Sequence, residues 1–137
     1  MTMPLRDRTP GSVVAEAVYG PFDREQLRRY AEASGDTNPL HLDPQFARQA
    51  GFDDVIVHGM LGMALLGRLV TEHLPTLRMT RLRTRFRAVI DLGQTIVCAA
   101  KLERLSQETA EVELIGRNAA GTVVLEGSAT LTFPVDT

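Results

Sequence analysis

The sequence predicts a single α+β domain in which an antiparallel sheet curls around one apolar helix. The segment from Gly59 to Leu66 carries no charged residue, and a helix that is apolar on every side is normally buried on every side. From about residue 81 onward, apolar and polar residues alternate with the period of β-strands. Because a buried helix and a two-faced sheet must cover each other, these two observations favour the wrapped arrangement.

The first elements are a weakly patterned strand and a helix with a clear start. We expect a strand near 12–19, where only Glu16 marks a polar face. The range Phe22–Ser34 is expected to form a helix, because Asp23 can cap it and Gln26 stands three residues later, as in a capping box.

An ordered loop and two further helices should follow. The range Ser34–His41 reads S-G-D-T-N-P-L-H, whose residues are typical of turns. Asp43 and Gly51 have the residue types that begin and end a short helix. The apolar helix is expected over Val55–Val70, a length that roughly matches the width of a small sheet.

Short turns near 91–93, 106–108 and 118–121 join the predicted strands, which indicates an antiparallel meander whose strand order the pattern does not fix. The residues expected to share one face of each strand are Leu82, Thr84, Phe86, Ala88 and Ile90; Ile96, Cys98, Ala100 and Leu102; Ala110, Val112 and Leu114; and Val123, Leu125, Ala129, Leu131 and Phe133.

Composition narrows the function classes. The 137 residues suit one domain over residues 1–137. The net charge of −2 argues against a nucleic-acid partner, whose phosphates reward a basic surface. The single cysteine, Cys98, cannot form an internal disulfide. The start of the chain lacks the apolar core of a signal peptide, and the apolar stretch Gly59–Gly67 is too short to span a bilayer. We therefore expect a cytoplasmic protein without a membrane partner.

Polar groups concentrate where the neighbouring chain is apolar. Asp36 and His41 lie five residues apart across a turn that Pro39 stiffens, a spacing that lets both side chains enter one cavity. His58 and Gly59 then open the apolar helix, whose first N–H groups carry partial positive charge. A carboxylate, an imidazole and an oxyanion donor are the parts needed for proton transfer beside a carbonyl.

The run Ser34–His41, followed by V-H-G-M-L at Val57–Leu61, resembles the signature of the MaoC-like dehydratases. That family includes R-specific enoyl-CoA hydratases and bacterial 3-hydroxyacyl-thioester dehydratases. The resemblance implies a hot-dog fold, a homodimer, and a hydro-lyase acting on an acyl-CoA or acyl-carrier-protein thioester. It also implies that neither a metal nor a redox cofactor is needed.

The resemblance assigns roles to individual residues. Asp36 and His41 match the catalytic pair, and Gly59 matches the glycine whose N–H holds the thioester oxygen. Asn38 matches the asparagine that arranges the catalytic loop, and we group it with Gly59 and His58 as substrate-binding. A water between the pair would then deliver hydroxyl to C3 and a proton to C2 of the acyl group.

Other readings of the same residues remain open. Asp36, His41 and His58 could bind a metal, although no firm fourth ligand lies nearby in the sequence. The arginines at positions 81, 83, 85 and 87 could form a solvated strand face or meet the phosphates of CoA or a carrier protein. Alternative functions are a hot-dog thioesterase, or a subunit of a heteromeric dehydratase.

Overall fold

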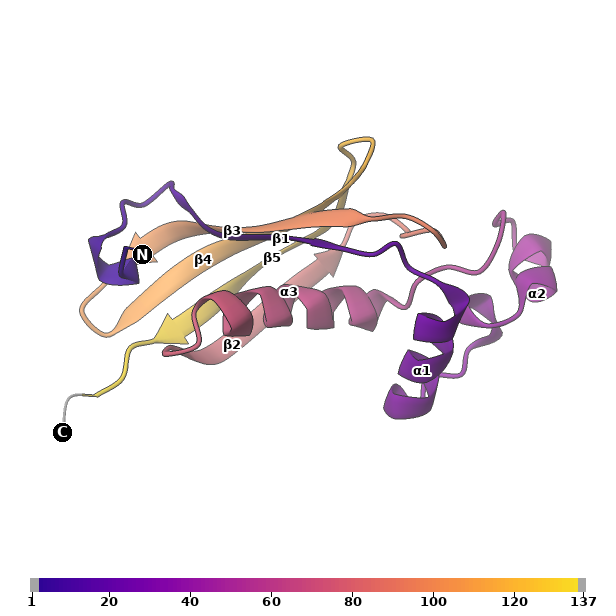
Figure 1. The fold of residues 1–137 in the computed structure, drawn as a ribbon, viewed down its shortest axis with the longest axis horizontal. Coiled ribbons are helices and arrows are strands. Elements are labelled where there is room, and N and C mark those ends of the chain that lie inside the picture. Colours follow the sequence, from indigo (N-terminus) through magenta and orange to yellow (C-terminus); the bar gives the residue numbers. More distant parts are fainter. Residues whose placement is uncertain (1–2, 136–137) are drawn as a thin grey trace.

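A long helix lies along one face of a five-stranded antiparallel sheet in the computed structural model, which describes residues 3–135 (Figure 1). This arrangement confirms the predicted α+β class. The elements, in chain order, are η1 (Leu5–Asp7), β1 (Val13–Tyr19), α1 (Arg24–Ser34), η2 (Pro39–His41), α2 (Pro44–Gln49), α3 (Gly59–His73), β2 (Arg78–Phe86), β3 (Ile96–Leu105), β4 (Thr109–Asn118) and β5 (Val123–Thr132).

The core lies between α3 and the sheet face that it covers. Alternate residues of the three central strands are buried there, as the period-2 pattern predicts. Fully or almost fully buried side chains on these strands are those of Ile96, Cys98, Ala100, Leu102, Ala110, Val112, Leu114, Leu125, Ala129 and Leu131. Leu66, Leu69 and Val70 of α3 complete this core from the other side.

The prediction of one continuous meander is wrong for its first strand. The sheet order is β1-β3-β4-β5-β2, so only β3, β4 and β5 follow one another as neighbours. β2 pairs with β5 at the far edge, and the chain then crosses to β3. β2 also ends at Phe86 and not at Ile90, because the N–H groups of Arg87 and Ala88 both donate to the carbonyl of Val124 and the chain leaves the sheet.

The apolar helix begins and ends later than predicted. α3 starts at Gly59 and continues to His73. The preceding residues are extended, because Ile56 forms a β-bridge with Asp91 and the Val57 N–H donates to the carbonyl of Ile90 at 2.9 Å.

The helix is also not buried on every side. The Met60 side chain is 54% exposed, and Ala64, one turn later, is exposed as well. None of the helices within residues 3–135 has both the length and the apolar character that crossing a bilayer requires.

The two shorter helices gather beyond one end of α3 (Figure 1). Asp23 caps α1 by accepting a hydrogen bond from the Gln26 N–H at 2.7 Å, which confirms the predicted cap, and the helix begins at Arg24, two residues after the start of the predicted range. Asp43 caps α2 in the same way, and Gly51 follows that helix with a φ of 99°. This end of the molecule carries the sequence motif.

Candidate active site

Asp36 is placed by the end of α1. Gly35 adopts a φ of 80°, a left-handed conformation that favours glycine, and its N–H donates to the carbonyl of Ala31 at 2.9 Å. The chain therefore turns sharply just before Asp36. One carboxylate oxygen of Asp36 accepts the Asn38 N–H at 3.3 Å. Asn38 in turn accepts the Leu40 N–H at 3.0 Å and caps η2, so its side chain shapes the loop.

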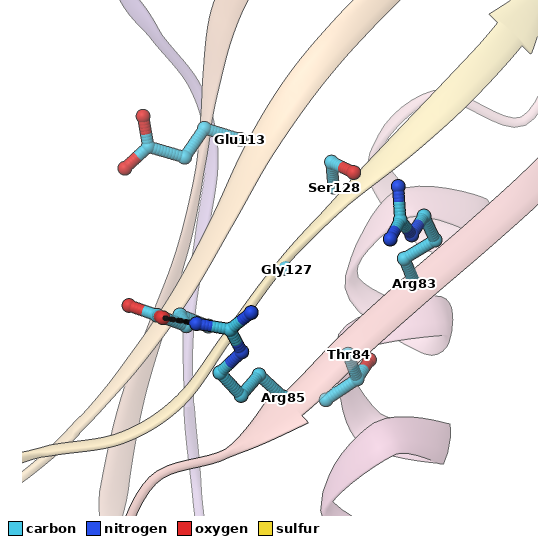
Figure 2. A pocket seen from close by; sticks show the side chains of 7 residues that line it. Arg83, Thr84, Arg85, Glu113, Gly127 and Ser128 are labelled. Atoms are coloured by element: carbon cyan, nitrogen blue, oxygen red, sulfur yellow. Dashed lines mark ion pairs between the residues drawn. The ribbon is translucent and has the colours of Figure 1, made fainter.

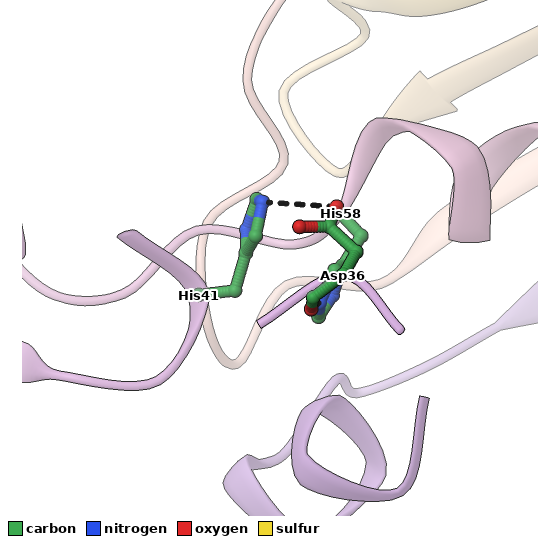
Figure 3. A group of neighbouring side chains, drawn as sticks. All are labelled: Asp36, His41 and His58. Atoms are coloured by element: carbon green, nitrogen blue, oxygen red, sulfur yellow. Dashed lines mark hydrogen bonds and ion pairs between the residues drawn. The ribbon is translucent and has the colours of Figure 1, made fainter. Parts of the chain in front are cut away.

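His41 is the last residue of η2, and Ile56 fixes its ring. The Nδ1 atom of His41 lies 2.8 Å from the Ile56 carbonyl. Because a carbonyl only accepts, Nδ1 carries the hydrogen in this bond. The other ring nitrogen, Nε2, lies 3.9 Å from a carboxylate oxygen of Asp36 (Figure 3). The structure thus brings the two predicted catalytic side chains together, with a gap wider than a direct hydrogen bond.

His58 lies behind this pair. Its side chain is fully buried, and its ring stacks on that of His41 with centroids 3.9 Å apart and planes 22° apart. Its Nε2 atom lies 3.2 Å from the backbone carbonyl of Asp36 and donates to it. Tyr30 meets the same ring edge-on at 4.8 Å. Burial and, to a smaller extent, the nearby His41 lower the pKa of His58, so the ring stays neutral. His58 therefore supports both candidate catalytic residues, whereas the sequence groups it with the substrate contacts.

Gly59 places a backbone N–H at the start of α3. No side chain caps this helix end, and the first N–H groups of a helix have no partner within it. A pocket of about 340 Å³ opens here, lined by His41 and Gly59, by the segments 56–57 and 86–90, and by Leu125. A polarising amide and an imidazole thus border one largely apolar cavity, as a thioester site requires.

The three polar side chains could also be read as a metal site. One ligand atom from each of Asp36, His41 and His58 lies within 4.8 Å of the others. However, the imidazole rings are stacked, so their in-plane nitrogen lone pairs run side by side instead of converging on one point about 2.0–2.1 Å away. The geometry favours hydrogen-bonded acid–base chemistry, and the absence of a metal requirement stays a prediction.

Two arginines of β2 line a second hollow, of about 380 Å³, on the other face of the sheet (Figure 2). Arg83 and Arg85 lie there with Glu113 and Glu126. Glu126 pairs with Arg85 at 3.9 Å and with Arg87 at 3.0 Å. Positive and negative groups therefore alternate on this face, which fits the solvated-surface interpretation. The phosphate interpretation stays a prediction.

Sequence reasoning missed most of the pocket wall. Phe86 and Ile90 were expected on one regular strand, but the strand ends between them and both face the cavity. The signal available was the run of consecutive apolar residues from Ala88 to Ile90, which breaks the period-2 pattern.

Comparison with known proteins places the chain in a family. The model of the MaoC-like domain family matches residues 6–124. A mitochondrial 3-hydroxyacyl-[acyl-carrier-protein] dehydratase of Arabidopsis thaliana is 34% identical over 119 residues, covering 82% of this chain and 71% of that protein. The (R)-specific enoyl-CoA hydratase of Aeromonas caviae is 36% identical over 93 residues, covering 68% of this chain and 62% of that protein.

A solved structure supports the same family assignment. The (R)-hydratase from A. caviae involved in PHA biosynthesis superposes with a TM-score of 0.86 at 26% identity, covering 94% of this chain and 99% of that one. The hot-dog fold and the hydro-lyase class that the sequence predicts are therefore confirmed: the chain belongs to the MaoC-like domain family.

Proposed function

We propose that this protein adds water reversibly to a 2-enoyl thioester, forming an (R)-3-hydroxyacyl thioester of CoA or acyl-carrier protein. The observation that carries the proposal is the 3.9 Å approach of Asp36 to His41 Nε2 beside the pocket that contains Gly59. The named activities of the A. thaliana and A. caviae relatives support the same reaction class.

The Gly59 N–H is the group that activates the substrate. In hydration, the thioester carbonyl draws electrons from C3, and its oxygen becomes enolate-like as water attacks. An uncapped helix start offers that oxygen a fixed hydrogen-bond donor together with the helix dipole. Such a donor is worth roughly 3–4 kcal/mol in other enzymes.

Asp36 and His41 move the protons. A water that contacts both the carboxylate and Nε2 loses one proton to the pair while its oxygen bonds to C3. The pair returns one proton to C2, so that water is added and both side chains regain their starting states. The Ile56 carbonyl holds the Nδ1 hydrogen of His41 throughout, which keeps Nε2 as the exchanging nitrogen. The reverse sequence dehydrates the hydroxyacyl thioester.

The test removes each side chain in turn. Asp36→Asn and His41→Ala should each lower crotonyl-CoA hydration, followed at the enoyl absorbance, by about 10²-fold or more. Asp53→Asn and His73→Ala are matched controls, because neither residue belongs to the cluster of Asp36, His41 and His58 or lines the pocket; both should keep nearly wild-type rates. Near wild-type hydration by well-folded Asp36→Asn or His41→Ala protein would refute the assignment.

Product analysis separates the remaining alternatives. Chiral chromatography of the hydrated product should give the R enantiomer, and an S product would contradict the proposal. A thiol reagent added to the same reaction should detect no CoA release, whereas stoichiometric release would indicate a thioesterase. Activity of the chain purified alone would separate it from a subunit that needs a different partner chain.

A further inference from the structure

One row of residues crosses the covered face of the sheet at the inner end of the pocket. The strand registers pair Phe86 with Leu125, Leu125 with Gly116, and Gly116 with Cys98. Leu125, Gly116 and Cys98 are all buried. The row therefore changes from large side chains beside the pocket to small ones further into the core.

Leu125 fills the gap between this row and α3. A Cβ atom added at Gly62 would lie 3.0 Å and 3.1 Å from its two Cδ atoms, and one added at Gly116 would lie 3.4 Å from its Cβ. The leucine is thus held between two glycines, one on the helix and one on the sheet, whose missing side chains make room for it. A Cβ on Gly116 would also lie 3.4 Å from the sulfur of Cys98. The small side chain of Cys98 therefore lies directly beyond Gly116 in this row.

Leu125 is also part of the pocket wall that contains His41 and Gly59. We infer that the Leu125 side chain is the end stop of the acyl pocket, which limits the enzyme to short 2-enoyl groups. This inference rests on the proposed function, because it assumes that the acyl chain enters from the Gly59 side. Shortening Leu125 joins the pocket to the space between Gly62 and Gly116 and lets a longer chain in.

The experiment compares chain lengths. Hydration is measured with crotonyl-CoA and 2-octenoyl-CoA for the wild type and for Leu125→Ala, which removes about three carbon atoms from the wall. The ratio of kcat/KM for the longer to the shorter substrate should rise by about tenfold or more, as expected for extra methylenes accommodated in an apolar site. Leu125→Val is a milder truncation that tests the same point if the alanine variant does not fold.

Leu114→Ala is the matched control. Leu114 is a fully buried leucine on the neighbouring strand β4, outside the pocket wall. It should lose similar stability while leaving the chain-length ratio unchanged. An unchanged ratio in folded Leu125 variants, or an equal rise in Leu114→Ala, would overturn the inference.

A binding measurement keeps the inference separate from the proposed function. Calorimetric titration with butyryl-CoA and octanoyl-CoA reports pocket length without turnover. Leu125→Ala should tighten octanoyl-CoA relative to butyryl-CoA even if no hydration is found in any variant. Wild-type failure to hydrate crotonyl-CoA would therefore count against the reaction, and unchanged relative affinities would count against the end stop.

Discussion

At the scale of single residues, the pair Asp36 and His41 depends on the fully buried side chain of His58. His58 donates to the Asp36 carbonyl and stacks on the His41 ring, and its own Nδ1 is buried without a hydrogen-bond partner among the described residues. A neutral, fully buried imidazole in such a place makes the folded state sensitive to acid.

The sign of that sensitivity follows from the lowered pKa of His58. When the pH falls below the ordinary histidine pKa of 6.5, His58 becomes protonated in the unfolded chain but stays neutral in the folded protein. Stability that is present at neutral pH is therefore lost as the pH falls through this range, by at most about 1.4 kcal/mol per pH unit for one group. His58→Gln, which does not titrate, should have a flatter profile of unfolding free energy between pH 7 and pH 5.

Urea titrations at several pH values measure this slope. His73→Gln makes the same substitution at the exposed end of α3, outside the cluster of Asp36, His41 and His58, and is the comparison for the effect of the residue change itself. Parallel profiles for wild type and His58→Gln would show that the buried ring does not hold its low pKa.

The spacing of Asp36 and His41 could be predicted from sequence, whereas the stacking of His58 on His41 could not, because the two histidines meet only after the chain folds.

At the scale of elements, the start of α3 carries the proposed oxyanion donor, and Gly59 can be tested against another glycine of the same helix. A Cβ at Gly59 would lie 3.4 Å from the Phe86 ring, and one at Gly67 would lie 3.4 Å from Leu82. Both alanines therefore meet similar crowding, but only Gly59 lines the pocket. Gly59→Ala should lower kcat/KM for crotonyl-CoA about tenfold or more, because its methyl group intrudes where the thioester oxygen binds.

Gly67→Ala should stay within about twofold of wild type, and its helix should gain up to about 1 kcal/mol from the better propensity of alanine. Steady-state kinetics and thermal melts of the two variants measure these effects. Equal losses of activity in both variants would mean that α3 tolerates no added methyl group. That result would contradict a specific role of Gly59 in binding the thioester oxygen.

The elements also show where sequence patterns stop being informative. Period-2 alternation predicts β3, β4 and β5 well, because burial on one face is local information. It marks β1 only weakly and places the end of β2 too late. It could not place β2 beside β5, since that pairing is set by long-range packing around α3. The predicted start of α3 is too early for a related reason. Val57 fits a helical pattern, but its N–H donates to the carbonyl of Ile90, which lies far away in the sequence.

At the scale of the whole molecule, both edges of the sheet carry exposed apolar side chains, since Val13 and Val18 of β1 are 48% and 63% exposed. Only at the β2 edge do such side chains adjoin the pocket and the start of α3. β1 forms one edge and β2 the other. Near the end of β2, the apolar side chains of Met60, Phe86 and Val89 are 54%, 50% and 42% exposed. An unpaired strand edge invites pairing with another chain, and exposed apolar groups beside it add a reason for burial. These features support the homodimer that the family resemblance implies, with β2 and the start of α3 at its interface.

Light scattering during gel filtration tests this arrangement. The wild type should elute with twice the 15.0 kDa mass of one chain. Met60→Glu places a charge among the exposed apolar groups and should shift the protein toward the monomer, since an unpaired charge is costly to bury. Val18→Glu is the matched control on the opposite edge, where the valine is 63% exposed on β1, and it should remain dimeric. A monomeric wild type, or dissociation by Val18→Glu alone, would move the interface away from β2.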